Sequence, residues 1–314
     1  MEIFDLGLAF IWEYDTDFIN LIEETLQKGG LTTFLVQEHN VYEVTEKIRD
    51  RKLSFKLYLD RASDVEPAFE DIGRILTRRK AIIINPYKKI QHAIDKASMH
   101  LEFINAGLNV PHSIIIPPHS ELEDVKLTVE DLSILGRPFI IKPCNTTGGG
   151  VGVVTGAETL MDVLHERRVN TDDKYIIQEK IYPSILEGKR AWFRCFWAFN
   201  KPIAVWWDDM SHIYEELTSE DIVRFSLRRL LYKTKIIAKI TELDFFSTEI
   251  VLNKENKFVV IDYVNDQCDM RFNSKHKDGV PDSTVKQIIN NLKNYIVRIK
   301  RLETINKNIQ NQGE

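Results

Sequence analysis

A glycine-rich stretch in the middle of the chain, residues 138–154 (PFIIKPCNTTGGGVGVV), limits most strongly what this chain can fold into. Its pattern predicts a strand at Phe139–Pro143 that carries Lys142, then a loop, then a second strand that opens at Val151. Glycine tolerates positive φ and lets the backbone come close to a ligand, so the amide groups of the loop can converge on an anion. The candidate anion-binding residues are Thr146, Thr147, Gly148, Gly149 and Gly150. A β-hairpin turn with surplus glycines is an alternative interpretation of the same residues, because a glycine-rich pattern indicates a binding loop only in the right structural context.

The same stretch argues against two common nucleotide-binding motifs. It lacks the G-x-x-x-x-G-K-[ST] spacing of the P-loop, and it joins a strand to a strand instead of leading into a helix. A P-loop NTPase site and a dinucleotide-binding Rossmann site are therefore disfavoured here.

The overall composition indicates an ordinary soluble globular protein. At 314 residues, the chain is long enough for about two domains at roughly 150 residues each. Hydrophobic residues make up 43% and charged residues 28% of the chain. The formal net charge of -5 gives no reason to expect nucleic acid as a partner. No apolar run approaches the roughly 20 residues that span a bilayer, so we expect no membrane partner.

The cysteines and the N-terminal residues indicate a cytoplasmic protein. Cys144, Cys195 and Cys268 are odd in number, widely spaced and without a C-x-x-C pair. This usage argues for a reducing compartment, and against a disulfide scaffold or a zinc site. The N-terminus, MEIFDLGLAFIWEYD, has no basic region and reaches acidic residues early, unlike a signal peptide. A homodimer is the common default assembly, and it is the one we consider.

Residues 1–90 alternate between strand-like and helix-like patterns, which predicts a mainly parallel sheet covered by helices. The predicted elements are strands Ile3–Ile11, Leu31–Val36, Phe55–Leu59 and Ala81–Asn85, and helices from Thr16 to Gly29, Tyr42–Lys52 and Glu66–Arg79. Trp12–Asp15 follows the first strand at its carboxyl end, where open α/β sheets bind ligands. A turn with a packed tryptophan is the alternative interpretation.

The middle of the chain adds further elements on both sides of the glycine-rich stretch. The pattern predicts a single helix from Lys88 to Gly107, with Lys96 inside it, where a solvated lysine is the ordinary interpretation. The other predicted elements are strands Ser113–Ile116 and Lys174–Glu179, helices Thr128–Leu135, Glu158–Arg168 and Glu220–Ile240, and a last helix, Ser283–Leu302, before a frayed polar tail.

Two arginines share one face of a strand within residues 189–208. Alternation places Arg190 and Arg194 on the same side as Trp192 and Phe196. A cleft that binds a carboxylate or a phosphate explains arginines beside aromatic residues. A plain solvent-exposed face is the alternative.

A predicted hairpin, Asp244–Leu252 with Lys257–Tyr263, brings two carboxylates together. Glu249 on one strand and Asp262 on the next can meet on one face, and Asn265 follows just beyond. Oxygen ligands of this kind suit Mg²⁺ beside substrate phosphates. An exposed face with scattered acids is the ordinary alternative. However, both strands are otherwise very apolar, and an unpaired carboxylate is costly to bury, which favours a metal partner.

Taken in order, these features resemble the ATP-grasp superfamily over about residues 95–270. DKASMHLEFINAGLNVP resembles the helix that bears the first nucleotide lysine, here Lys96, and FIIKP resembles the strand that presents the second, Lys142. TTGGGVGVV resembles the loop that covers the ATP phosphates, and STEIVLNKENKFVVIDYVND resembles the metal-binding end, with Glu249, Asp262 and Asn265 as ligands.

The resemblance also implies an adenine side and an acyl side of the site. YIIQEKI resembles the adenine-side strand, which implies that Gln178, Glu179, Lys180 and Ile181 bind the nucleotide. EGKRAWFRCF resembles the Gly-Asp-Lys-Arg stretch of bacterial glutathione synthetases, which places Arg190 near phosphates or the acyl substrate. Glu187 is the candidate ribose carboxylate. Arg190, Arg194 and Arg271 are the candidates for holding a carboxylate substrate.

The fold that the resemblance implies is an α/β ATP-grasp fold, with two α+β lobes enclosing a nucleotide cleft, preceded by a Rossmann-like parallel α/β domain. The expected boundaries are 1–90 for the N-terminal domain, 91–302 for the ATP-grasp domain and 303–314 for the tail. Within the ATP-grasp domain, we expect a small lobe at about 120–185 and a large lobe at about 186–302.

The implied activity is an ATP-dependent ligation. ATP with Mg²⁺ (or Mn²⁺) would phosphorylate a small-molecule or peptide carboxylate, with Lys142, Arg190 and Arg194 as catalytic residues, and an amine or thiol would then displace the phosphate. A small-molecule kinase and a non-catalytic nucleotide-binding protein of the same fold are the alternatives. The altered ending after Asn265, where the usual Pro-Gly is absent, motivates the last. A second departure is that Asp262-Tyr263-Val264-Asn265 replaces the usual acid-x-Asn. Either a one-residue bulge restores the geometry or Asp266 joins the ligands.

Overall fold

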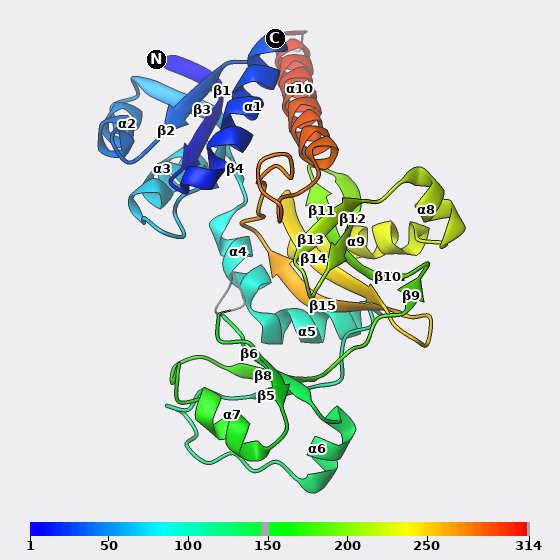
Figure 1. Cartoon of the computed structure of the whole chain (residues 1–314). Helices are drawn as coiled ribbons and strands as arrows, with labels where there is room; N and C mark the ends of the chain where they lie inside the picture. The colour runs from blue at the N-terminus through cyan, green and yellow to red at the C-terminus, as the bar shows by residue number, and fades with distance from the viewer. Residues whose placement is uncertain (146–150, 313–314) are drawn as a thin grey trace.

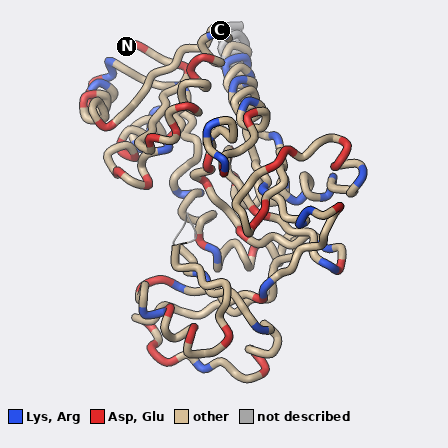
Figure 2. Tube along the Cα trace, viewed as in Figure 1, with Lys and Arg blue, Asp and Glu red and all other residues tan. Residues whose placement is uncertain are grey.

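The computed structural model describes residues 1–145 and 151–312. Within them, three sheets of four or five strands follow one another through the molecule (Figure 1). Positively and negatively charged residues alternate along the backbone in all three parts (Figure 2). No helix in the described ranges is long and apolar enough to cross a membrane.

The N-terminal sheet is parallel, as the alternating pattern predicted. Its strands are β1 (Glu2–Phe10), β2 (Thr33–Val36), β3 (Leu53–Arg61) and β4 (Ile82–Ile84), in the order β2-β1-β3-β4. Its helices are α1 (Thr16–Lys28), α2 (Val41–Arg49) and α3 (Ala68–Arg78), and a short 3-10 turn, η1 (Glu13–Asp15), precedes α1. Buried residues of α1 pack on one face of the sheet, and those of α2 and α3 pack on the other. This is the two-sided cover that parallel strands require.

The small lobe, as we use the name, is the antiparallel sheet at the bottom of Figure 1 with its two helices. Its strands are β5 (Ser113–Ile116), β6 (Phe139–Pro143), β7 (Val154–Ala157) and β8 (Tyr175–Glu179), in the order β5-β8-β6-β7. Its helices, α6 (Val129–Leu135) and α7 (Leu160–Glu166), each begin with a capping box. In both, a threonine and an aspartate three residues later satisfy each other's backbone amides.

The large lobe is built on a five-stranded antiparallel sheet. Its strands are β11 (Trp192–Ala198), β12 (Lys201–Asp208), β13 (Ile213–Glu216), β14 (Phe245–Leu252) and β15 (Phe258–Asn265), in the order β13-β12-β11-β14-β15, with a two-stranded ribbon of β9 (Ile185–Leu186) and β10 (Lys189–Arg190) beside it. Helices α8 (Ser219–Arg224) and α9 (Arg228–Thr241) cover one face, while α10 (Asp282–Gln312) packs against the other and beside α1 (Figure 1). One hydrophobic core therefore joins the large lobe to the N-terminal domain.

The predicted helix from Lys88 to Gly107 is in fact two helices, α4 (Tyr87–Ile94) and α5 (Lys96–Asn105). Asp95 between them is extended, with φ -69 and ψ 101, and its carboxylate accepts hydrogen bonds from two backbone amides in the first turn of α5. An aspartate N-cap of this kind starts a new helix. The break places Lys96 at the first position of α5 instead of within a continuous helix.

Two further predictions of secondary structure need correction, and one strand was missed. The predicted helix Glu220–Ile240 is divided into α8 and α9 around Ser226, which has φ 56, outside the helical range. The last helix continues to Gln312, so residues 303–312 extend α10 instead of forming a frayed tail. Strand β13, at the edge of the large-lobe sheet, was not predicted.

A buried ion pair fixes the N-terminal domain to the chain that follows β15. Arg61, at the end of β3, donates two hydrogen bonds of 2.8 Å to the carboxylate of Asp15, and its Nη2 also donates to the carbonyl of Cys268 at 2.8 Å. Both side chains of the pair are almost fully buried. Because a guanidinium presents several donors in a rigid plane, one arginine can connect two elements of one domain with a loop of another.

Candidate functional site

Lys142 of the small lobe reaches the large lobe. It lies on β6, is 8% exposed, and its Nζ donates a 3.1 Å hydrogen bond to the carbonyl oxygen of Ile261 on β15. Ile261 immediately precedes Asp262. The strand that carries the predicted phosphate lysine and the strand that carries a predicted metal ligand therefore meet at this point.

Lys96 joins the same group from a third element. Its backbone amide donates to the carbonyl of Cys144 at 3.0 Å, just beyond the end of β6. Burial lowers the pKa of the Lys96 ammonium, the Asp262 carboxylate acts in the opposite direction, and Lys142 lowers it further. Lys96, Lys142 and Asp262 are therefore within electrostatic reach of one another. A second anion at this point, such as a phosphate, would relieve the repulsion between the two lysines.

The predicted pairing of Glu249 with Asp262 is present in the register of β14 and β15. Ser247 faces Asn265, so two steps along β14 correspond to three steps along β15. An extra residue therefore lies between Asp262 and Asn265, which is the bulge that the altered spacing suggested. A second irregularity follows, because Ile250 faces Val260 and leaves Ile261 without a partner in the register.

Glu249 is held by two N–H donors from β11. Arg194 approaches one carboxylate oxygen at 2.6 Å, and Trp192 Nε1 donates to the other at 2.8 Å. The Arg194 and Glu249 side chains are 12% and 13% exposed. Burial alone would lower the pKa of the Arg194 guanidinium, but the Glu249 carboxylate outweighs it and raises that pKa. The guanidinium also lies over the ring of Trp207, 5.1 Å from its centroid.

The three predicted metal ligands fit a hard divalent cation by their donor chemistry. No group of three or more His, Cys, Asp or Glu side chains with metal-binding geometry occurs in the described part of the chain. The predicted set has a different composition, two carboxylates and the Asn265 amide, all oxygen donors of the kind that Mg²⁺ accepts. An ionised carboxylate offers about four acceptor positions. The two donors on Glu249 therefore leave it able to take a further partner.

The predicted adenine-side residues differ in their burial and in their hydrogen-bond partners. Gln178 is 2% exposed, and its Nε2 donates to Ser113 Oγ at 3.1 Å and to Tyr263 Oη at 2.9 Å. Its side chain therefore joins the two lobes, a contact that the sequence did not predict. The Glu179 carboxylate accepts the backbone amide of His112 at 2.7 Å.

The next two residues of this stretch remain partly exposed. Ile181 packs beside Val251, Val259 and Ile261 of the large lobe. Lys180 lies 5.9 Å from the ring centroid of Tyr182.

Three further predicted residues are bound to partners outside the lysine–aspartate group. Arg190 is bound through two hydrogen bonds, of 2.6 and 2.8 Å, to Asp209. Glu187 is in the β9–β10 turn with φ 49 and forms an ion pair with Arg224. Arg271 is bound by the carboxylates of Asp269 and Asp278 and faces the rings of Trp12 and Tyr14. The aromatic residues after β1 thus contact this arginine.

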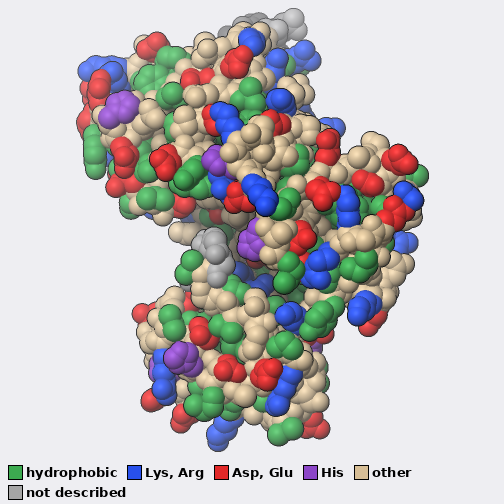
Figure 3. All heavy atoms as spheres, viewed as in Figure 1, with side chains coloured by type: hydrophobic (Ala, Val, Ile, Leu, Met, Phe, Trp, Pro, Cys, Tyr) green, Lys and Arg blue, Asp and Glu red, His purple; other side chains and the backbone are tan. Residues whose placement is uncertain are grey.

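The predicted glycine loop, Thr146 to Gly150, lies outside the described residues. The residue before it is held firmly: the Asp173 carboxylate accepts the backbone amide of Asn145 at 3.0 Å and its side-chain amide at 2.8 Å. On the face shown in Figure 3, the surface is hollowed between the small lobe and the parts above it.

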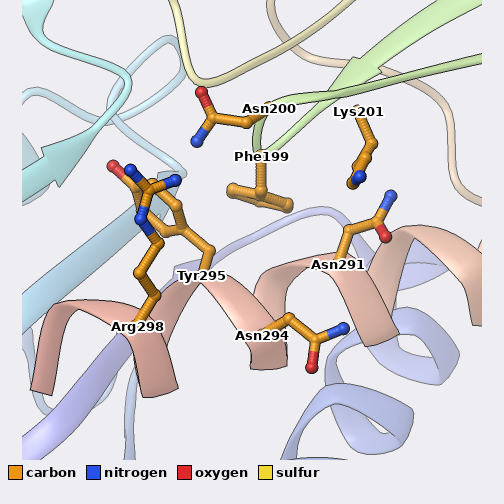
Figure 4. A pocket seen from close by; sticks show the side chains of 7 residues that line it. All are labelled: Phe199, Asn200, Lys201, Asn291, Asn294, Tyr295 and Arg298. Carbon is orange, nitrogen blue, oxygen red and sulfur yellow. The ribbon is translucent and has the colours of Figure 1, made fainter. Parts of the chain in front are cut away.

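Two cavities of the large lobe are separate from this group. One, of about 150 Å³, lies between the β11–β12 turn and α10 (Figure 4), and the other, of about 530 Å³, lies along α9. Among the residues that the structure describes, none of the predicted site residues lines either cavity. We base the candidate site on the convergence of Lys96, Lys142 and Asp262, since cavity size carries no information about chemistry.

Comparison with known proteins gives structural matches only. No model of a known protein family matches the chain, and no curated protein sequence matches it. The D-alanine–D-alanine ligase of Bacillus anthracis complexed with ATP superposes with a TM-score of 0.65 at 14% identity, over 95% of this chain and 98% of that chain. A RimK domain ATP-grasp protein of Sphaerobacter thermophilus gives 0.61 at 16% identity, over 93% and 99%. The macrocyclase MdnB of Microcystis aeruginosa gives 0.59 at 13% identity, over 95% and 99%.

The chain has the ATP-grasp fold. The matches span its parallel N-terminal domain and both antiparallel lobes, so the fold predicted from the motifs is confirmed over nearly the whole chain. The sequence did not reveal the partners Trp192 and Tyr263. Their roles depend on contacts between residues 57 and 85 positions apart, which a local pattern does not contain.

Proposed function

We propose that this chain is an ATP- and Mg²⁺-dependent ligase that joins a carboxylate to an amine or a thiol through an acylphosphate. The observation that carries the proposal is the contact of Lys142 with the carbonyl of Ile261, next to Asp262. It supports a single site that takes cationic groups from the small lobe and α5, and oxygen ligands from the large lobe. A site of that composition suits a nucleoside triphosphate.

The two lysines would bind the phosphates. Lys96 and Lys142 already approach one another, and the downward shift in the pKa of Lys96 indicates that burial and repulsion oppose its charge. A triphosphate placed between them would restore the favourable environment of both ammonium groups. This arrangement is fixed before the substrate binds, so little reorganisation is needed as charge develops on the transferred phosphoryl group.

Glu249, Asp262 and Asn265 would hold the magnesium ion. When bound, Mg²⁺ neutralises phosphate charge and orients the phosphate oxygens. Arg194 and Trp192 fix the Glu249 carboxylate in place, and the Arg194 charge reduces the repulsion between Glu249 and Asp262. Arg194 is also the candidate residue for a carboxylate substrate, since it is the one of the three predicted arginines that contacts a predicted metal ligand.

The proposed reaction has two steps. An oxygen of the substrate carboxylate bonds to the γ-phosphorus of ATP, and the bond from that phosphorus to the bridging oxygen breaks, which releases ADP. The nitrogen of an amine, or the sulfur of a thiol, then bonds to the acyl carbon, the phosphate leaves, and the nucleophile gives up one proton. Small molecules and peptides both suit the comparison, because the matches include a D-alanine–D-alanine ligase and PsnB complexed with a precursor peptide.

An ADP-release assay tests this function. The protein is incubated with ATP and Mg²⁺ and with three additions in turn: an amino-acid and peptide pool, a polyol pool, and buffer alone. Release that requires both an acid and an amine supports the ligase. Release that depends on the polyol pool contradicts it and favours a kinase. Nucleotide binding without release under any addition favours a non-catalytic protein, and Asp262→Asn identifies release by a contaminant.

A further inference from the structure

We propose that Tyr263 is a positioning residue that ties the adenine-side strand to the metal-binding end of β15. This inference rests on the proposed function, since it assigns Asp262 and Asn265 to the metal. Tyr263 is one of the two residues that separate Asp262 from Asn265, where the chain is one residue longer than the usual acid-x-Asn spacing.

The Tyr263 side chain is buried where both lobes and α5 meet. It is 2% exposed, and its ring packs edge-on against Phe103, with centroids 5.2 Å apart. Its hydroxyl lies 2.5 Å from His100 Nδ1 on α5 and 2.9 Å from Gln178 Nε2 on β8. One hydroxyl therefore contacts the helix that begins with Lys96 and the strand that precedes Glu179.

The hydrogen bonds around this hydroxyl form a chain with a defined direction. The Gln178 amide donates to both the Tyr263 and the Ser113 hydroxyls, and the Ser113 hydroxyl donates onward to the carbonyl of Pro111 at 2.8 Å. The Tyr263 hydroxyl can therefore donate its own proton in a hydrogen bond to His100 Nδ1. Burial lowers the pKa of His100 to about 4, so its ring is neutral at neutral pH and Nδ1 can accept that proton. Donor and acceptor match at each step.

The hydrogen bonds of the Tyr263 hydroxyl explain how the longer segment between Asp262 and Asn265 is held in place. The irregular register between Glu249 and Ser247 leaves the segment from Asp262 to Asn265 without a regular ladder partner at each residue. Such a bulged segment needs other contacts to hold one conformation. The Tyr263 hydroxyl supplies them from α5 and from β8 of the small lobe, so the relative position of β8 and β15 sets the position of the two oxygen ligands on either side of Tyr263. Nucleotide binding at β8 and metal binding at β15 are then coupled.

The test is the factor by which Mg²⁺ tightens the binding of a non-hydrolysable ATP analogue, measured by calorimetry with Mg²⁺ and with EDTA. Tyr263→Phe removes only the hydroxyl. We expect this factor to fall about tenfold, the loss that corresponds to the net contribution of about one buried hydrogen bond. The affinity measured in EDTA should change less than about twofold, because the adenine contacts and the lysines remain.

Tyr175→Phe is the matched control. Tyr175 lies on the same strand as Gln178, is also 2% exposed, and its hydroxyl donates to the backbone carbonyl of Glu166 at 2.8 Å inside the small lobe. The same atom is removed from a comparable environment, away from β15. We expect Tyr175→Phe to lower the melting temperature to a similar extent and to leave the Mg²⁺ factor unchanged.

Gln178→Met removes the connection from its other end and serves if Tyr263→Phe fails to fold. It should lower the Mg²⁺ factor to a similar extent, and the double variant should lower it no further than either alone. Equal Mg²⁺ factors in Tyr263→Phe, Tyr175→Phe and the wild type would overturn the proposal. If Mg²⁺ does not tighten binding in the wild type, the proposed function itself is wrong, so the two failures are distinguishable.

Discussion

The Nζ of Lys142 and the carbonyl oxygen of Ile261 lie 3.1 Å apart across the boundary between the small and large lobes. Ile261 has no partner in the β14–β15 register, so its carbonyl can accept the lysine. The irregular segment of β15 thus accepts a hydrogen bond from Lys142 of the small lobe, and this contact places the ammonium group beside Asp262. The predictions below follow from this contact and from the groups around it.

Lys142→Ala should reduce ADP release by at least about 100-fold, the usual loss when a preorganised group that stabilises transition-state charge is removed. The variant also leaves the Ile261 carbonyl without its donor, which should cost about 1 kcal/mol of unfolding free energy. Steady-state kinetics and urea unfolding measure the two effects. Lys257→Ala, on the turn of the same hairpin that carries Asp262, removes an exposed cation paired with Glu255 and should change neither. Unchanged ADP release in Lys142→Ala would contradict the site.

Asp262→Asn should abolish Mg²⁺-dependent release while preserving the fold. The amide has the same shape but no charge, so a divalent cation loses a strong ligand and Lys96 loses the carboxylate that opposes its pKa shift. We expect a change in Tm below about 2 °C, because the backbone contacts of β15 remain. Glu255→Gln, an exposed acid in the same hairpin, is the control. A loss of stability in Asp262→Asn as large as that of a core substitution would mean that the carboxylate is structural.

The sequence predicted those parts of the fold that depend on local pattern. Strands β1, β6 and β14 have runs of apolar residues bounded by polar ones, and each lies within two residues of its predicted bounds. The pairing of Glu249 with Asp262 was also predictable, because a short turn connects the two strands and fixes which residues face each other.

The features that the sequence did not predict depend on competing local signals or on contacts between residues that are far apart in the sequence. The amphipathic pattern continues across Asp95, and only the capping hydrogen bonds of its carboxylate divide α4 from α5. The partners of Glu249 come from β11, and two strands (β12 and β13) and two helices (α8 and α9) lie between β11 and β14 in the sequence. The resemblance implies a nucleotide role for the stretch that contains Gln178, but the contact of its side chain with Tyr263 joins residues 85 positions apart, which a local pattern does not contain.

Arg194→Met should destabilise the protein by about 3 kcal/mol, because it leaves the buried Glu249 carboxylate without its cation. The double variant Arg194→Met with Glu249→Gln removes both charges and should recover most of the loss in urea unfolding. ADP release should stay low in the double variant, since the metal ligand and the candidate substrate arginine are both absent. Full stability in the single variant would show that this ion pair contributes little to folding.

His100→Gln should alter how stability depends on pH. Burial, together with the nearby His112, lowers the pKa of His100 to about 4, whereas an imidazole in an unfolded chain titrates near about 6.5. Between these two values the unfolded chain binds one proton more than the folded chain at this position. The free energy of unfolding contributed by His100 therefore rises with pH through the window from about 4 to about 6.5.

The difference between wild type and variant isolates this contribution. Other groups titrate in the same window: burial raises the pKa of Asp266 to about 6, which acts in the opposite direction because the folded state then holds the extra proton. Urea midpoints at pH 4.5 and 6.5 should therefore show a steeper rise with pH in the wild type than in His100→Gln. His92→Gln, an exposed histidine of α4 paired with Glu102, should keep the wild-type slope. If His100→Gln has the wild-type slope as well, His100 is not a neutral acceptor for Tyr263, and the direction of the hydrogen-bond chain has to be reversed.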